Sequence, residues 1–112
     1  MHYVSTRGAA PAQRFSDILL EGLAADGGLY VPERFPPADL GAWRGLSYPA
    51  LALEILAQFA DDIPNADLRR IVSETYTKES FGSEESAPLA TLEPGLHLLG
   101  LSNGPTLAFK DM

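Results

Sequence analysis

The chain has 112 residues, of which 46% are hydrophobic and 21% are charged, and its formal net charge is −7. A chain of this length suits one domain, and its composition is neither that of a disordered segment nor that of a membrane protein. The acidic balance argues against nucleic-acid binding, which needs a basic surface. Because cysteine is absent, disulfides, thiolate-held zinc and a cysteine nucleophile are excluded.

The beginning of the chain shows no targeting signal. It lacks a basic segment followed by an apolar run, so it does not resemble a secretory signal peptide. The longest apolar stretch, residues 49–60, contains Glu54 and Gln58 and is shorter than the roughly 20 residues that span a bilayer. We therefore expect a cytoplasmic protein that contacts neither membranes nor nucleic acids.

The first thirty residues predict a strand, a helix and a second strand. Residues 3–7 are rich in aromatic and β-branched side chains, as short strands are. Ser16 is placed to cap a helix, which Asp26-Gly27-Gly28 would end because glycine tolerates the left-handed turn required there. Residues 29–31 would form the second strand. The apolar face of the helix would consist of three leucines, Leu19, Leu20 and Leu23.

Two further helices are expected in the middle of the chain. Ser47 would cap a helix that extends to about Ala60. Apolar residues lie around most of the circumference of this helix, so we expect it to be buried on several sides. Asn65 would cap the next helix, in which an apolar stripe at helical spacing extends from Leu68 to Tyr76. The acidic pair at 61–62 is expected to be an ordinary solvated surface group.

A polar stretch at residues 82–88 is the best candidate for a domain boundary, so we divide the chain into domains 1–88 and 89–112. Residues 89–92 and 96–101 would form strands joined by a turn. A loop then leads into a helix start at 107–110, which resembles the opening of a βα unit that needs further strands to be stable.

The elements together predict an α+β or α/β fold. It would consist of a small N-terminal domain with short strands and about three helices, followed by the first strand and loop of a larger α/β domain. Because that second domain is incomplete, we expect a truncated chain.

Most catalytic motifs are absent, and His2 and His97 are too far apart in the sequence to suggest a metal site, so no metal is expected. Lys110 is the exception. It follows the apolar residues Leu107, Ala108 and Phe109, whereas Lys78 lies among polar residues. Burial among apolar groups disfavours the charged form of a lysine and prepares its amine for Schiff-base chemistry. The same residues also allow an amphipathic helix start whose lysine extends into solvent.

Residues 101–111, LSNGPTLAFKD, resemble the GPT-x-AFKD segment of threonine synthases. Residues 3–8, YVSTRG, resemble the family's STRG strand, and residues 15–32, FSDILLEGLAADGGLYVP, resemble its FSDALLxGLAPDGGLYVP stretch. Trp43, residues 46–48 and residues 51–59 are also similar to the family's approach to the second helix. These matches follow the family's order over nearly the whole chain, which therefore resembles the N-terminal part of a fold-type II enzyme that uses pyridoxal 5'-phosphate.

The resemblance implies that Lys110 binds pyridoxal phosphate covalently and that its released amine carries a proton between Cα and Cβ of the substrate. The full-length enzyme would be a carbon–oxygen lyase acting on phosphates, which converts O-phospho-L-homoserine and water to L-threonine and phosphate. Phe109 would pack near the cofactor ring or serve as a plain core aromatic. Thr106 and Asn103 would donate hydrogen bonds to cofactor or substrate. Many members of the family have a histidine where this chain has Asn103. Unlike histidine, asparagine cannot shuttle a proton.

Two features limit what this segment would do alone. Ser5, Thr6 and Arg7 form a polar patch that would either tie down the terminus, which we favour, or meet a substrate phosphate. The only adjacent glycine pair, 27–28, is expected to end a helix, so no glycine-rich loop is available for the cofactor phosphate. We therefore expect this segment alone to hold no cofactor and to be inactive, with the remainder of the catalytic domain as its partner.

Two alternatives remain open. One is a threonine synthase-like phospholyase acting on another phosphorylated hydroxy amino acid, and the other is a non-catalytic, stand-alone interaction domain.

Overall fold

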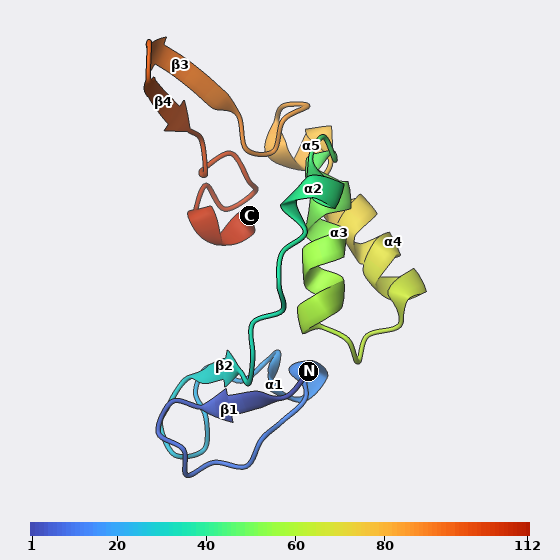
Figure 1. The fold of residues 1–112 in the computed structure, drawn as a ribbon, viewed down its shortest axis with the longest axis vertical. Coiled ribbons are helices and arrows are strands. Elements are labelled where there is room, and N and C mark those ends of the chain that lie inside the picture. The colour runs from blue at the N-terminus through green and yellow to red at the C-terminus, as the bar shows by residue number, and fades with distance from the viewer.

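The computed structural model describes all 112 residues in a body of 48 × 31 × 30 Å. An N-terminal sheet and a C-terminal hairpin lie at opposite ends, with helices between them (Figure 1). Two antiparallel two-stranded sheets and five α-helices confirm the expected α+β class. The elements are β1 (Tyr3–Ser5), α1 (Phe15–Ile18), β2 (Tyr30–Pro32), α2 (Leu40–Trp43), α3 (Tyr48–Phe59), α4 (Asn65–Thr75), α5 (Lys78–Phe81), β3 (Leu89–Glu93), β4 (Leu96–Leu99) and a final 3-10 turn, η1 (Phe109–Asp111).

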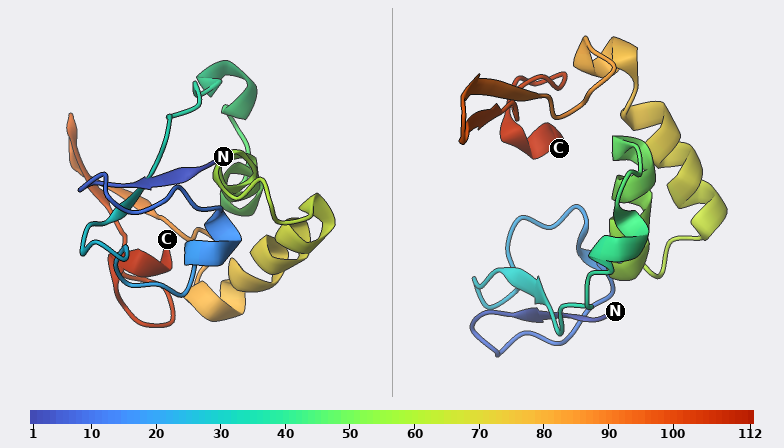
Figure 2. Two further views of the ribbon diagram at one scale, coloured as in Figure 1. Left: turned by 90° about the horizontal axis from the view of Figure 1, so that it is seen from below. Right: turned by 45° about the horizontal axis from the view of Figure 1, so that its top comes forward.

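The core lies between α3 and α4, which run side by side (Figure 2). Leu53 of α3 packs against Leu68 and Val72 of α4, and all three side chains are buried. The apolar stripe predicted for the second of these helices is confirmed at Leu68 and Val72. The prediction that α3 is buried on several sides is wrong for this chain, because α4 covers only one side and Leu53 is its one buried residue.

The predicted helix caps need correction although the helices begin where expected. Ser47 precedes α3, but its side chain makes no capping hydrogen bond. Asn65 is the first residue of α4, and Pro64 holds the cap position. The one-turn helices α2 and α5, which were not predicted, do have side-chain caps: Asp39 accepts from the backbone N–H of Ala42, and Thr77 accepts from that of Ser80.

The largest error concerns the helix predicted from Ser16 to Asp26, because α1 ends after one turn at Ile18. The leucines expected on its apolar face are exposed, Leu20 at 96%. A short amphipathic helix depends on packing of its apolar face, and here nothing covers that face. Ser16 is not the cap either, since its N–H and hydroxyl both donate to Asp62, at 2.9 and 2.6 Å.

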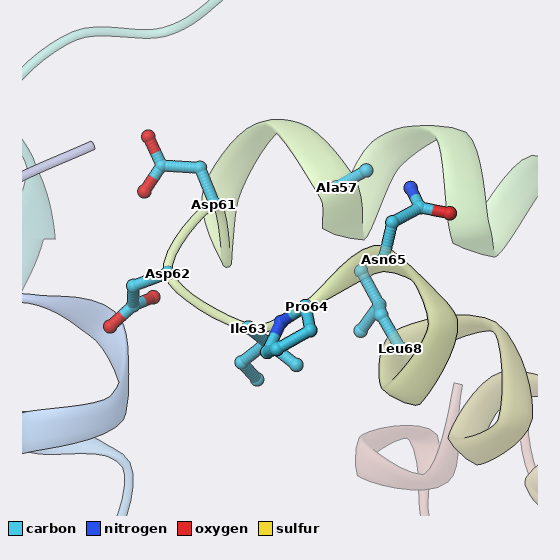
Figure 3. Close-up of a pocket in the computed structure, with 7 residues that line it drawn as sticks. All are labelled: Ala57, Asp61, Asp62, Ile63, Pro64, Asn65 and Leu68. Atoms are coloured by element: carbon cyan, nitrogen blue, oxygen red, sulfur yellow. The ribbon is translucent and has the colours of Figure 1, made fainter.

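The acidic pair after α3 anchors the N-terminal sheet, contrary to the expectation of ordinary surface groups. Asp61 pairs with the amino group of Met1, and Asp62 accepts from Ser16. Figure 3 shows both carboxylates on the side of the turn that faces the blue N-terminal segment. These hydrogen bonds hold the pKa of Asp61 and of Asp62 below the usual range. The Tyr3 hydroxyl adds a hydrogen bond of 2.9 Å to the backbone oxygen of Phe59.

The C-terminal hairpin has the predicted strands, with β3 one residue longer and β4 two residues shorter than expected. Gly95 has a φ of +83° in the connecting turn, a conformation that favours glycine. Every residue of both strands is exposed. Among all the helices of the chain, none combines the length and the apolar character needed to cross a membrane.

Candidate functional site

Lys110 lies in η1, at the end of the loop that follows the hairpin. Its side chain is exposed and forms no hydrogen bond or ion pair within the chain, whereas the Nζ atom of Lys78 pairs with the Glu84 carboxylate at 2.7 Å. Of the two lysines, only Lys110 therefore offers an unpaired primary amine. Both lysines are exposed, so Lys110 extends into solvent, as the amphipathic alternative predicts, and it differs from Lys78 in being unpaired rather than in being buried.

The apolar residues around Lys110 do not bury it within this chain. Leu107 is 73% exposed and Phe109 is 69% exposed, so the expected apolar pocket is not formed by the residues next to the lysine. Met112 lines a small apolar hollow together with Tyr48 and Tyr76, which places the end of this segment beside α3. Residues outside this loop would have to supply any further burial of Lys110.

Asp111 closes the loop that contains Lys110. Its Oδ2 atom accepts from the backbone N–H of Thr106 at 2.8 Å, and its Oδ1 atom accepts from the Thr106 hydroxyl at 2.7 Å. The hydrogen bond from that hydroxyl is the main reason why the pKa of Asp111 is lowered. Both donors of Thr106 are thus already used within the chain. A contact between Thr106 and a cofactor stays a prediction, and in this conformation its oxygen would accept rather than donate.

Gly104 is buried beneath this contact. A Cβ atom at position 104 would lie 2.6 Å from Oδ2 and 2.8 Å from Cγ of Asp111, so only glycine leaves room for the carboxylate. Leu107 has a φ of +57° and is the one non-glycine residue of the chain with a positive φ. Sequence reasoning gave no role to Gly104 or Asp111. A threonine and an aspartate five residues apart, with a glycine two residues before the threonine, were the available signal.

Asn103, Thr106, Phe109 and Lys110 all belong to this one loop and turn. Asn103 is half-buried, and Phe109 is adjacent to the lysine in η1. The chain gives Asn103 and Phe109 no partner that decides their roles, so both stay predictions.

The polar patch near the N-terminus has a structural role. The buried Ser5 hydroxyl donates to Asp26 Oδ1 at 2.7 Å, and Arg7 Nη1 donates to the backbone oxygen of Asp26 at 3.0 Å. The Asp26 carboxylate also accepts backbone N–H groups from Ala9, Ala10 and Gly28. The Ser5 hydrogen bond, helped by these N–H groups, lowers the pKa of Asp26 to about 2. Asp26 therefore organises this turn rather than ending a helix.

Comparison with known proteins identifies the family. A family model described as the threonine synthase N terminus matches residues 2–76. The chain belongs to the threonine synthase N-terminal family. The matched region ends before Lys110, and the domain boundary at residue 88 stays a prediction.

Relatives of this threonine synthase N-terminal chain extend the match to its C-terminal end. A threonine synthase of Methylobacillus glycogenes is 53% identical over all of the chain, which covers 26% of that protein. A threonine synthase of Corynebacterium glutamicum is 50% identical over all of the chain and 25% of that protein. A crystal structure of pyridoxal-phosphate-bound threonine synthase from Brucella melitensis superposes with a TM-score of 0.90 at 47% identity, covering 99% of this chain and 24% of that one. The chain thus spans about a quarter of the length of these relatives.

Proposed function

We propose that this threonine synthase N-terminal chain supplies the cofactor lysine of a pyridoxal-phosphate-dependent carbon–oxygen lyase. In the full-length protein, the enzyme would convert O-phospho-L-homoserine and water to L-threonine and phosphate. The observation that carries the proposal is the exposed, unpaired amine of Lys110 within a chain that matches threonine synthases along its whole length.

The residues present fit the anchor of the cofactor, because a free primary amine is the group that a carbonyl cofactor requires. Pyridoxal phosphate, when bound, supplies an electron sink for negative charge at the substrate carbons. Lys110 would bind the cofactor and, once released, hold and move a proton between the substrate's Cα and Cβ atoms. Phe109 would cover the cofactor ring, and Asn103 would donate a hydrogen bond through its amide without shuttling a proton.

The phosphate groups of cofactor and substrate need a cluster of backbone N–H donors, for which the sequence near Lys110 offers no glycine-rich loop. The chain's adjacent glycines, 27 and 28, belong to the turn at Asp26, directly before β2 of the N-terminal sheet. We infer that the remainder of the catalytic domain supplies these donors and covers the exposed apolar residues of the hairpin. Inactivity of the isolated chain and a cytoplasmic location stay predictions.

The test is phosphate release by the full-length protein, measured with O-phosphohomoserine and, in parallel, with O-phosphothreonine. We expect phosphate and threonine from the first compound, loss of both in Lys110→Ala, and normal turnover in the control variant Lys78→Ala. Preferential turnover of O-phosphothreonine would instead favour the phospholyase alternative. Absence of turnover with either compound in a cofactor-loaded protein would favour the non-catalytic interaction domain.

A further inference from the structure

We propose that Asp111 is a positioning residue for Lys110, because its carboxylate fixes the loop that presents the lysine amine. This inference rests on the proposed function, in which Lys110 is the cofactor lysine. It assigns Asp111 no contact with cofactor or substrate. Asp111 would act on Lys110 only by fixing the backbone on either side of that residue.

The contact joins the two ends of the segment that carries the lysine. Asp111 holds Thr106 through two hydrogen bonds, of 2.8 and 2.7 Å, to a charged acceptor, which is the stronger kind of hydrogen bond. Two backbone hydrogen bonds complete the closed loop, from Leu107 N–H to the Gly104 oxygen and from Asp111 N–H to the Ala108 oxygen. Lys110 lies between Ala108 and Asp111, so its backbone is held on both sides while its side chain stays free.

The backbone conformation of this loop is unfavourable by itself and needs a contact that holds it, here the pair of hydrogen bonds between Asp111 and Thr106, which we call the clamp. A positive φ at a bulky residue such as Leu107 is unfavourable and persists only where surrounding contacts hold it. The side chains of Leu107 and Phe109 are exposed, so their packing does not hold the loop. The Asp111–Thr106 contact holds the loop in this conformation, and Gly104 leaves the space that the Asp111 carboxylate needs.

Loss of the clamp should free the lysine without unfolding the protein. The hydrogen bonds of Asp111 all stay within residues 106–111, whereas the core is formed by Leu53, Leu68 and Val72. A misplaced reactive group costs roughly a hundredfold in rate when it moves by about 1 Å. We therefore expect Asp111→Ala to slow cofactor capture by Lys110 about tenfold to a hundredfold and to leave the melting temperature nearly unchanged.

The experiment uses the full-length apoprotein and measures capture of pyridoxal phosphate by absorbance, as a rate and as a dissociation constant. Asp111→Ala and Thr106→Val should both slow capture, whereas Thr106→Ser, which keeps the hydroxyl, should behave as wild type. The double variant Thr106→Val with Asp111→Ala should be no slower than Asp111→Ala alone, because both changes break one contact. Asp39→Ala is the matched control, since Asp39 caps α2 with a comparable hydrogen bond of 3.0 Å.

Each outcome separates the two proposals. If Lys110→Ala still captures the cofactor covalently, the proposed function fails. If Lys110→Ala abolishes capture but Asp111→Ala captures as fast as wild type, only the positioning role fails. The positioning role is also overturned if slower capture in Asp111→Ala follows a matching loss of thermal stability, or if the two single changes add in the double variant.

Discussion

Gly28→Ala should destabilise the N-terminal sheet although the substitution adds a single methyl group. A Cβ atom at this buried position would overlap the Ser5 hydroxyl and lie 3.1 Å from both the Arg7 nitrogen and Asp26 Oδ1. Ser5 is itself buried, so its side chain cannot move into solvent without leaving Asp26. Overpacking by a methyl group in such a site costs about 1–3 kcal/mol. We expect a loss of about 2 kcal/mol in the free energy of unfolding.

The assay is urea denaturation followed by circular dichroism, with Gly22→Ala as the matched control. Gly22 is exposed and has no atom within 4 Å of the added carbon, so that change should be neutral or stabilise by less than about 1 kcal/mol. In the double variant Ser5→Ala with Gly28→Ala, the overlapping oxygen is gone, and the second change should cost much less than it does alone. Equal losses of stability in Gly22→Ala and Gly28→Ala would show that the added methyl group does not overlap Ser5.

Two further predictions concern acid stability and the core. The pKa of Asp26 is about 2 in the folded chain, below the ordinary aspartate value of 3.8, so the unfolded chain binds the proton more readily. Stability is therefore lost as the pH falls from about 4 toward 2. An acid titration should show this loss, and Asp26→Asn should flatten the profile in that window; an unchanged profile would contradict the assignment. Leu68→Ala, at a 5% exposed residue, should cost about 3 kcal/mol in urea denaturation, whereas Leu20→Ala, at 96% exposure, should change stability by under about 0.5 kcal/mol. Similar costs for both would contradict the placement of the core.

The parts of the fold that were predictable from sequence are those where a local pattern and its packing agree. The apolar stripe from Leu68 to Val72 faces α3, and Gly95 supplies the turn that the hairpin requires. The leucines after Ser16 have a helical pattern but no surface to pack against, so local pattern alone misled there. The roles of Asp61, Asp62 and Asp26 depend mainly on partners 16 or more residues away, which spacing along the chain does not reveal.

The candidate site, like the fold, was predictable from the sequence only in part. The sequence set Lys110 apart from Lys78 by its apolar neighbours, but both side chains are exposed, and the structure distinguishes them by the ion pair of Lys78 with Glu84 instead. The exposure of Phe109 and Leu107 was not predictable, because apolar neighbours in sequence do not ensure a buried environment. The clamp by Asp111 depends on a backbone turn through Leu107 that residue patterns do not indicate.

The central claim is that Lys110 is the residue that binds pyridoxal phosphate. Borohydride reduction of the full-length, cofactor-loaded protein would make that bond permanent, and peptide mass mapping would then locate it. We expect a pyridoxyl adduct on the peptide containing Lys110 and none in Lys110→Ala. An adduct on any other lysine of the wild-type protein, with Lys110 unmodified, would contradict it.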